Sequence, residues 1–74
     1  MKLKNRIREL RFHNGEMSQQ ALADAAEVTR MTIYSIEKEK FVPSALLAFK
    51  IARAFGKDIN DVFWLEDEQT GGEK

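Results

Sequence analysis

AAEVTRMTIYSIE, residues 25–37, has the pattern of one helix ending, a very short turn and a second helix beginning. Thr29 is a favoured helix N-cap, and Ile33 and Ile36 behind it have the spacing of a buried helical face. A turn this tight needs one residue in the left-handed backbone conformation, which glycine adopts most easily. The sequence has Glu27 at that position. The stretch therefore predicts two short helices joined at some conformational cost.

The composition limits what the chain can be. A length of 74 residues allows one small domain with a modest core. There is no cysteine, and the single His13 cannot build a metal cage, so we expect no disulfide, metal or other cofactor. No apolar run approaches the roughly 20 residues that span a bilayer, and the N-terminus lacks the apolar core of a secretory signal. We therefore expect a cytoplasmic protein with no membrane partner.

The formal net charge of zero conceals an uneven distribution. Residues 1–57 contain 11 Lys and Arg against 6 Asp and Glu, whereas residues 58–74 contain 1 against 6. A basic body with an acidic end indicates an anionic partner for the basic part, without saying which partner.

The hydrophobic pattern predicts five short helices and no strand-rich region. The first runs from about Leu3 to Asn14-Gly15, and the others follow the N-caps Ser18, Thr29, Ser44 and Asp58. Gly56 is expected to end the fourth helix, and residues 63–65 to form an extended apolar segment. The expected fold is all-α, a compact five-helix bundle over residues 1–65, followed by an acidic, disordered tail at residues 66–74.

The second and third helices have the small residues that close packing requires. Ala23 and Ala26 allow the helices to cross at a steep angle, and Val28 fills the corner between them. These features suit a helix-turn-helix unit, but the spacing alone fits any compact helical bundle with a short αα corner equally well.

The outward face of the third helix favours a helix-turn-helix over another kind of compact helical bundle. Arg30 lies in the first turn, where a recognition helix meets base edges, and arginine binds guanine in a bidentate manner. Met31 could contact a thymine methyl group. The alternatives are a solvated surface charge for Arg30, accidental exposure for Met31, and for Tyr34 a place over the edge of the core.

Other polar residues lie where they could contact a DNA backbone. Gln19 and Thr29 stand at the starts of the second and third helices, where free backbone N–H groups bind anions. Lys38 and Lys40 follow the third helix, although lysines in loops are usually just solvated.

Glu37 is expected to face inward, on the apolar side of the third helix. A buried carboxylate needs a cation, and Arg11 at the inner edge of the first helix is the candidate. We therefore predict a structural ion pair between Arg11 and Glu37.

The sequence gives little support for an enzyme active site. A serine nucleophile needs a base, and every serine here would depend on His13 in a chain with no apparent cleft. The acidic end lacks the ligand spacing of a calcium loop, and neither a phosphate-binding glycine loop nor a dinucleotide fingerprint is present. We do not expect an enzyme.

Residues 15–63 resemble the Cro/phage-repressor (Xre-like) type of helix-turn-helix transcriptional regulator, in its small single-domain form. The similarity covers roughly residues 4–63, and its most specific pieces are EMSQQ-LA, VTR-TI-IE and PS-LAFKIARAFG in register. It implies a lambda-repressor-like, all-α fold. It also implies a homodimer that places two recognition helices in successive major grooves of partly palindromic double-stranded DNA.

The resemblance also implies roles for individual residues. Gln19 falls where the family contacts phosphate, and Arg30, Met31 and Ser35 fall where it reads bases. Tyr34 and Lys40 fall at nearby DNA-facing positions. Arg11 and Glu37 fall where related repressors form an internal ion pair. With the reasoning above, the expected base-reading residues are Arg30, Met31, Ser35 and Tyr34, and the expected phosphate-binding residues are Gln19, Thr29, Thr32, Lys38 and Lys40.

The chain departs from the family at three positions. Glu27 replaces the usual turn glycine, Met31 a common glutamine, and Glu39 the usual glycine after the recognition helix. A non-glycine residue in the left-handed conformation costs on the order of 1 kcal/mol. We expect Met31 to shift base preference towards apolar contact, and Glu39 to weaken DNA affinity by repulsion.

We therefore expect a sequence-specific transcriptional repressor that occupies its operator as a homodimer and has no small-molecule ligand domain. The final apolar stretch exceeds what one small body can cover. The expected dimer interface consists of Val62, Phe63, Trp64 and Leu65, with residues 1–3 adding a short strand.

Two alternatives remain open. The chain could be the antitoxin of a toxin–antitoxin pair, with the segment from Glu66 engaging a toxin. It could instead be a protein-interaction module that has lost DNA binding, which the zero net charge and Glu39 would allow.

Overall fold

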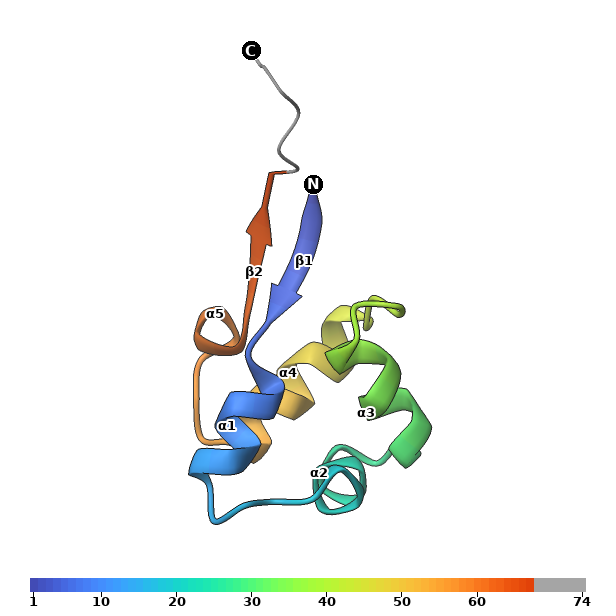
Figure 1. The fold of residues 1–74 in the computed structure, drawn as a ribbon, viewed down its shortest axis with the longest axis vertical. Coiled ribbons are helices and arrows are strands. Elements are labelled where there is room, and N and C mark those ends of the chain that lie inside the picture. The colour runs from blue at the N-terminus through green and yellow to red at the C-terminus, as the bar shows by residue number, and fades with distance from the viewer. Residues whose placement is uncertain (68–74) are drawn as a thin grey trace.

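Five helices pack around one core, and a ribbon of two strands stands out from them (Figure 1). The computed structural model describes residues 1–67. In chain order its elements are β1 (Lys2–Asn5), α1 (Ile7–His13), α2 (Gln19–Ala26), α3 (Arg30–Glu37), α4 (Ala45–Ala54), α5 (Ile59–Val62) and β2 (Phe63–Glu66). The five expected helices are therefore present. Of the tail expected at residues 66–74, Glu66 belongs to β2 and residues 68–74 lie outside the described part.

The two strands correct the expectation of an all-α fold. β1 and β2 pair antiparallel, with Lys2 opposite Glu66, Leu3 opposite Leu65, Lys4 opposite Trp64 and Asn5 opposite Phe63. Leu3 has helical spacing to Ile7, but the first helix begins only at Ile7. The short strand expected at residues 1–3 is present as β1, and its partner lies at the other end of the same chain. The extended segment expected at residues 63–65 is confirmed as part of β2.

Hydroxyl oxygens cap the N-termini of α2, α3 and α4, as the sequence predicts. Each hydroxyl oxygen accepts a hydrogen bond from the backbone N–H of the residue three positions later. The N–H of Ala21 donates to Ser18 at 2.9 Å, that of Thr32 to Thr29 at 3.3 Å and that of Leu47 to Ser44 at 3.1 Å. A cap of this kind satisfies a donor that the helix itself cannot, and contributes about 1 kcal/mol.

The core draws on every helix. Its largest fully buried side chains are Ile7, Leu22, Ile33, Ile36, Ile51 and Val62. Phe63, the first residue of β2, is also buried, with 5% of its surface exposed. Val62 and Phe63 are thus not available at the surface, although the sequence analysis included them in a dimer interface. Of that apolar stretch, Trp64 and Leu65 stay 37% and 64% exposed.

Glutamates occupy left-handed positions after α2 and α3. Glu27 and Glu39 both have φ of +63°. After each, the chain folds back on its helix: Val28 N–H donates to the Ala23 carbonyl, and Lys40 N–H to the Ser35 carbonyl, both at 2.9 Å. This is the hydrogen bonding of a glycine-ended helix. The turn in residues 25–37 therefore forms without glycine, whereas α4 ends at Gly56, with φ of +67°, as expected.

Each of these two glutamates is paired with a lysine from another element. Lys50 Nζ on α4 lies 2.8 Å from Glu27 Oε1, and Lys4 Nζ on β1 lies 3.1 Å from Glu39 Oε2. A negative charge is unfavourable at a helix C-terminus, where the backbone carbonyls are unpaired. The lysines offset that charge and connect each turn to a neighbouring element.

The Glu27 pair predicts a pH dependence of stability. The hydrogen bond and positive charge of Lys50 hold the pKa of Glu27 below its ordinary value of 4.5. Since the folded state has the lower pKa, the pair stabilises the fold above the unfolded-state pKa and loses this effect as pH falls through the folded-state pKa. Lys50→Met should therefore lower stability at neutral pH, and the difference from wild type should close in acid.

Urea denaturation of both proteins, at neutral pH and in acid, measures this difference. Lys57→Met is the matched control, because Lys57 is exposed and makes no ion pair within residues 1–67. A deficit in Lys50→Met that is equally large in acid would show that Lys50 acts through packing instead.

Candidate nucleic-acid interface

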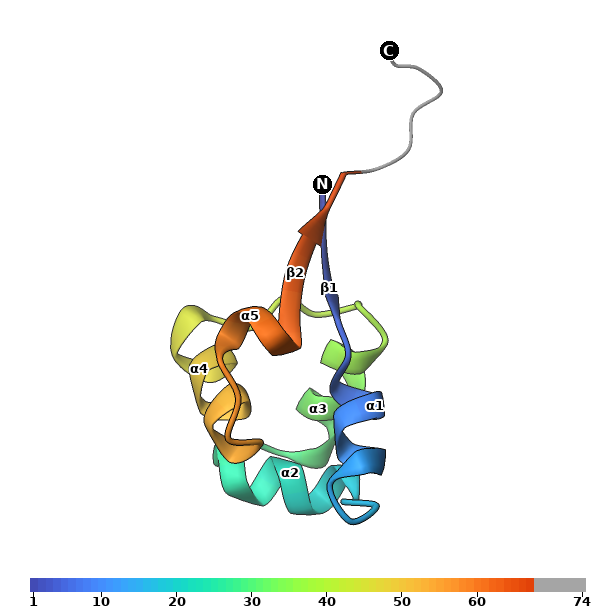
Figure 2. The ribbon, with the colours of Figure 1, turned by 90° about the vertical axis from the view of Figure 1, so that its left-hand side faces the viewer.

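α2 and α3 pack against each other at a corner, and α3 presents one face away from the body (Figures 1 and 2). Ala23 and Ala26 are fully buried, which allows the close approach expected from their size. Ile33 and Ile36 anchor the inner face of α3 in the core. Together α2, the turn at Glu27 and α3 form a helix-turn-helix.

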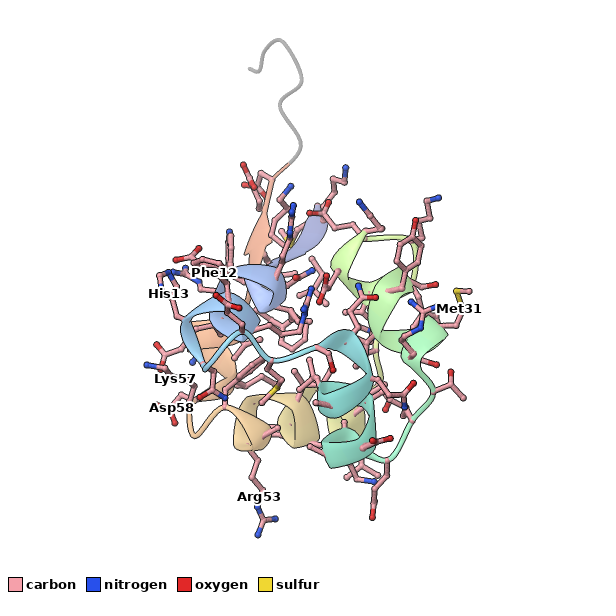
Figure 3. The ribbon with its side chains drawn as sticks, turned by 60° about the horizontal axis from the view of Figure 1, so that its bottom comes forward. Phe12, His13, Met31, Arg53, Lys57 and Asp58 are labelled. Carbon is pink, nitrogen blue, oxygen red and sulfur yellow. The ribbon has the colours of Figure 1, made fainter. Side chains whose placement is uncertain are left out.

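The outer face of α3 carries the expected base-reading residues. Arg30 is exposed in the first turn, and Met31 is 60% exposed and points away from the body (Figure 3). Tyr34 is 37% exposed, and the ammonium of Lys38 lies 5.8 Å from its ring centroid. Ser35 is half-buried beside them. These side chains therefore lie together on one surface.

The expected phosphate-binding residues flank this surface. Gln19 is the first residue of α2, and Thr29 precedes the first residue of α3. Thr29 and Thr32 are joined through their hydroxyl oxygens at 3.0 Å. Lys38 and Lys40 are exposed after the last turn of α3. The two helix N-termini, with their unpaired N–H groups, give this side of the motif a capacity for anions.

Arg11 and Glu37 form a two-point ion pair beneath the surface. Arg11 Nε lies 2.6 Å from Glu37 Oε2, and Arg11 Nη2 donates to Oε1 at 3.2 Å. The side chains are only 16% and 7% exposed. Arg11 Nη1 also donates to the Met17 carbonyl at 2.8 Å. One guanidinium thus holds α1, the loop before α2 and the end of α3 together.

Gln19 extends this pair to the surface. Its amide Nε2 donates to Glu37 Oε1 at 3.2 Å, and its Oε1 accepts from Arg30 Nη1 at 3.3 Å. A continuous line of polar contacts therefore runs from Arg11 inside the protein to Arg30 outside. Nothing in the sequence pattern signals this link, because it depends on where three helices meet.

Glu39 is not a free charge beside the interface. Its carboxylate lies 3.1 Å from Lys4 Nζ and 3.9 Å from Lys2 Nζ, and its side chain is 26% exposed. The repulsion expected from the sequence is therefore countered by two lysines of β1.

Asn5 is a connecting residue that the sequence analysis missed. Its amide Nδ2 donates to the Ile36 carbonyl at 3.0 Å, and its Oδ1 accepts from Ile7 N–H at 3.1 Å. It thus ties β1 to the end of α3 and satisfies a donor at the start of α1. An asparagine just before a helix is a recognisable capping signal. Placing the start of the first helix at Leu3 concealed it.

The serine residues and His13 do not come together as a catalytic group. Ser18 and Ser44 use their hydroxyl oxygens as helix caps. His13 lies on α1 against Phe12, with ring centroids 5.6 Å apart, well away from Met31 (Figure 3). Within residues 1–67 no His, Cys, Asp and Glu side chains gather as metal ligands, and no helix there has the length and apolar character to cross a membrane.

The fold and the exposed face of α3 define a helix-turn-helix protein, and comparison with known proteins agrees. A family model described as helix-turn-helix matches residues 7–62. The chain is 50% identical over 66 residues to the uncharacterized HTH-type transcriptional regulator YgzD of Bacillus subtilis, covering 89% of this chain and 98% of YgzD. It is 46% identical over 70 residues to an HTH-type transcriptional regulator of Archaeoglobus fulgidus, covering 95% and 99% of the two chains.

A third relative, from Methanocaldococcus jannaschii, is 46% identical over 68 residues, which are 90% of this chain and all of that protein. The protein belongs to the helix-turn-helix family of transcriptional regulators, which are DNA-binding proteins and not enzymes.

The Arg11–Glu37 pair should show strong non-additivity on mutation. Arg11→Met leaves a nearly buried carboxylate without its cation, and should lower the free energy of unfolding by about 3 kcal/mol. Adding Glu37→Leu removes that unpaired charge, so the double variant should be more stable than Arg11→Met alone. Urea denaturation of wild type, both single variants and the double variant measures the coupling. Single costs that simply add would contradict a buried, coupled pair.

Proposed function

We propose that the protein is a sequence-specific transcriptional repressor that binds a partly palindromic operator as a homodimer. The observation that carries the proposal is the outer face of α3. Arg30, Met31 and Tyr34 stand exposed on a helix whose inner face is fixed in the core. A rigid helix with a polar and apolar outer face suits the major groove, which an α-helix fills. Occupying an operator in this way would exclude other proteins from it.

We assign the base contacts to residues in the first turn and the centre of α3. Arg30 can donate two parallel hydrogen bonds to guanine O6 and N7, and the thioether of Met31 can pack on a thymine methyl group. Ser35 and Tyr34 follow on the same face and are proposed to meet the neighbouring base pair. This pairing of one charged and one apolar reader predicts a half-site containing both guanine and thymine.

Phosphate contacts hold the helix in register without reading sequence. We assign them to residues at both ends of α3 and the start of α2: Gln19, Thr29, Thr32, Lys38 and Lys40. The pairing of Glu39 with Lys2 and Lys4 lowers the local repulsion of phosphate. It also weakens the case for an interaction module without DNA binding, which rested partly on Glu39.

We assign the dimer contact to the exposed end of the two-stranded sheet of β1 and β2. Leu65 is 64% exposed opposite Leu3, and Met1, which precedes β1, is 72% exposed. Burying apolar surface of this kind between two copies is favourable. Two-fold symmetry of the protein would then match two-fold symmetry of the operator. Trp64 contributes less freely, since the Arg6 guanidinium lies 4.7 Å from its ring centroid within the same chain.

Selection of duplexes from a random pool tests base reading. Arg30→Ala should lose about 1–3 kcal/mol of discrimination at one base pair of the selected motif. Met31→Gln should change the preferred base at a neighbouring pair. Arg53→Ala is the control, because Arg53 on α4 points away from Met31 (Figure 3). A motif that Arg30→Ala leaves unchanged would exclude Arg30 as a base reader.

The same duplexes separate a DNA-binding protein from an interaction module. Affinity should fall steeply as salt rises, because each phosphate contact releases counterions. No binding to any duplex at low salt would favour the module, and co-purification with a toxin from native cells would favour the antitoxin.

Leu65→Glu tests the dimer contact. Two like charges would meet at the two-fold axis, so the variant should sediment as one chain and bind the operator at least about tenfold more weakly. Phe12→Glu is the control: Phe12 is equally exposed, at 64%, but lies on α1. A Leu65→Glu protein that still sediments as a dimer would place the interface elsewhere.

A further inference from the structure

Two lysines of β1 meet the glutamate that follows α3. Lys4 Nζ lies 3.3 Å from Glu39 Oε1 and 3.1 Å from Glu39 Oε2, and Lys2 Nζ lies 3.9 Å from Glu39 Oε1. Lys2 and Lys4 are two positions apart on a strand, so their side chains project from the same face of it. Both ammonium groups therefore lie beside one carboxylate.

This carboxylate lies among the residues proposed to contact the DNA backbone. Glu39 stands in the chain between Lys38 and Lys40, which are exposed after the last turn of α3. Lys2 and Lys4 come from the start of the chain to the same end of α3. Four lysines against one glutamate leave an excess of positive charge there, which attracts an anion.

The ion pairs of Glu39 are of a kind that can be exchanged. The side chains of Lys2, Lys4 and Glu39 are 56%, 31% and 26% exposed, so water and salt screen the pairs and their net contribution to stability is small. The Arg11–Glu37 pair is only 16% and 7% exposed, and breaking it would leave a nearly buried charge unpaired. A phosphate oxygen accepts the same charge-assisted hydrogen bond from lysine as a carboxylate oxygen does. Transfer of the two lysines from Glu39 to a phosphate should therefore cost little.

We propose that Lys2 and Lys4 bind phosphate groups of the DNA backbone, and that Glu39 competes with the DNA for them. The inference rests on the proposed function and adds β1 to its DNA contacts. In the free protein the carboxylate takes the place of a phosphate and keeps both ammonium groups beside α3. When DNA binds, the ammonium groups turn from the carboxylate to the phosphates. Glu39 thereby lowers the affinity for every duplex by about the same factor, since phosphate contacts carry no sequence information.

A purely neutralising role for the lysines makes a different prediction. If Lys2 and Lys4 only offset the charge of Glu39, removing all three charges together leaves DNA binding as it was. If the lysines bind phosphate, the same change removes contacts with the DNA backbone. The salt dependence of binding distinguishes the two roles, because it reports the number of phosphates that the protein neutralises.

The triple variant Lys2→Met, Lys4→Met, Glu39→Gln makes this change. Its affinity for the operator selected by wild type is measured over a range of salt concentrations. Each lost phosphate contact should make the slope of log affinity against log salt shallower by about 0.9. Lys57→Met is the matched control, because it too lowers the net charge by one positive unit, and Lys57 is exposed and lies well away from Met31 (Figure 3). Lys2→Met alone is a milder second variant, and its slope should change in the same direction.

Glu39→Gln alone tests the competition. It frees both lysines and keeps the shape of the side chain, so the affinity should rise roughly twofold to fivefold, the range that a surface ion pair covers. The rise should be equal for the operator and for an unrelated duplex, because phosphate is common to both. An unchanged or lower affinity, or a rise for the operator alone, would show that Glu39 does not compete with DNA.

Thermal melting shows that each variant is folded. A triple variant with the same salt slope as Lys57→Met would overturn phosphate binding by Lys2 and Lys4 while leaving DNA binding itself standing. Failure of wild type to bind any duplex at low salt would overturn the proposed function, and this inference with it.

Discussion

The ion pair between Arg11 and Glu37 is the interaction on which the arrangement of α2 and α3 depends. Helices of eight residues, such as α2 and α3, are marginal alone and take their positions from packing. The guanidinium of Arg11 is within hydrogen-bonding distance of the carboxylate that ends α3 and of the Met17 carbonyl before α2. Desolvation offsets much of the energy that such a pair could contribute. Its main effect is therefore geometric: it determines where the end of α3 lies relative to the start of α2.

A second constraint is the left-handed turn, and here the protein departs from the residue that local physics prefers. Glu27 and Glu39 have both an unfavourable backbone conformation and a negative charge at a helix C-terminus. Lys50 and Lys4 counter the charge, and they come from α4 and β1. A glycine would relax the backbone but would lose the link. The glutamates thus cost local conformational energy but form tertiary connections at both ends of α3.

Features of this structure that depend on neighbouring residues could be predicted from the sequence. Most features that join distant parts of the chain could not. The caps at Ser18, Thr29 and Ser44 and the glycine end at Gly56 depend on residues within a few positions, and the sequence predicts them correctly. The two-stranded sheet joins opposite ends of the chain, so the sequence assigns Leu3 both to a helix whose spacing it fits and to a short strand at residues 1–3, and only the strand is present. For the site, inward placement of a carboxylate was enough to suggest the partner of Glu37. The link through Gln19 was not predictable, because it requires the relative positions of three helices.

Hydrogen bonds from other elements fix both ends of α3, whereas Met31 near its start is exposed. At its C-terminal end, Asn5 donates to the Ile36 carbonyl and Arg11 to Glu37. At its N-terminal end, Gln19 accepts from Arg30. Met31 stands beside Arg30 and is 60% exposed. A flexible thioether can pack against several apolar shapes, whereas an oriented guanidinium suits few acceptors. In the proposed base-reading role, the oriented Arg30 should therefore contribute most of the specificity, with Met31 adding a weaker preference for a thymine methyl group at the neighbouring base pair.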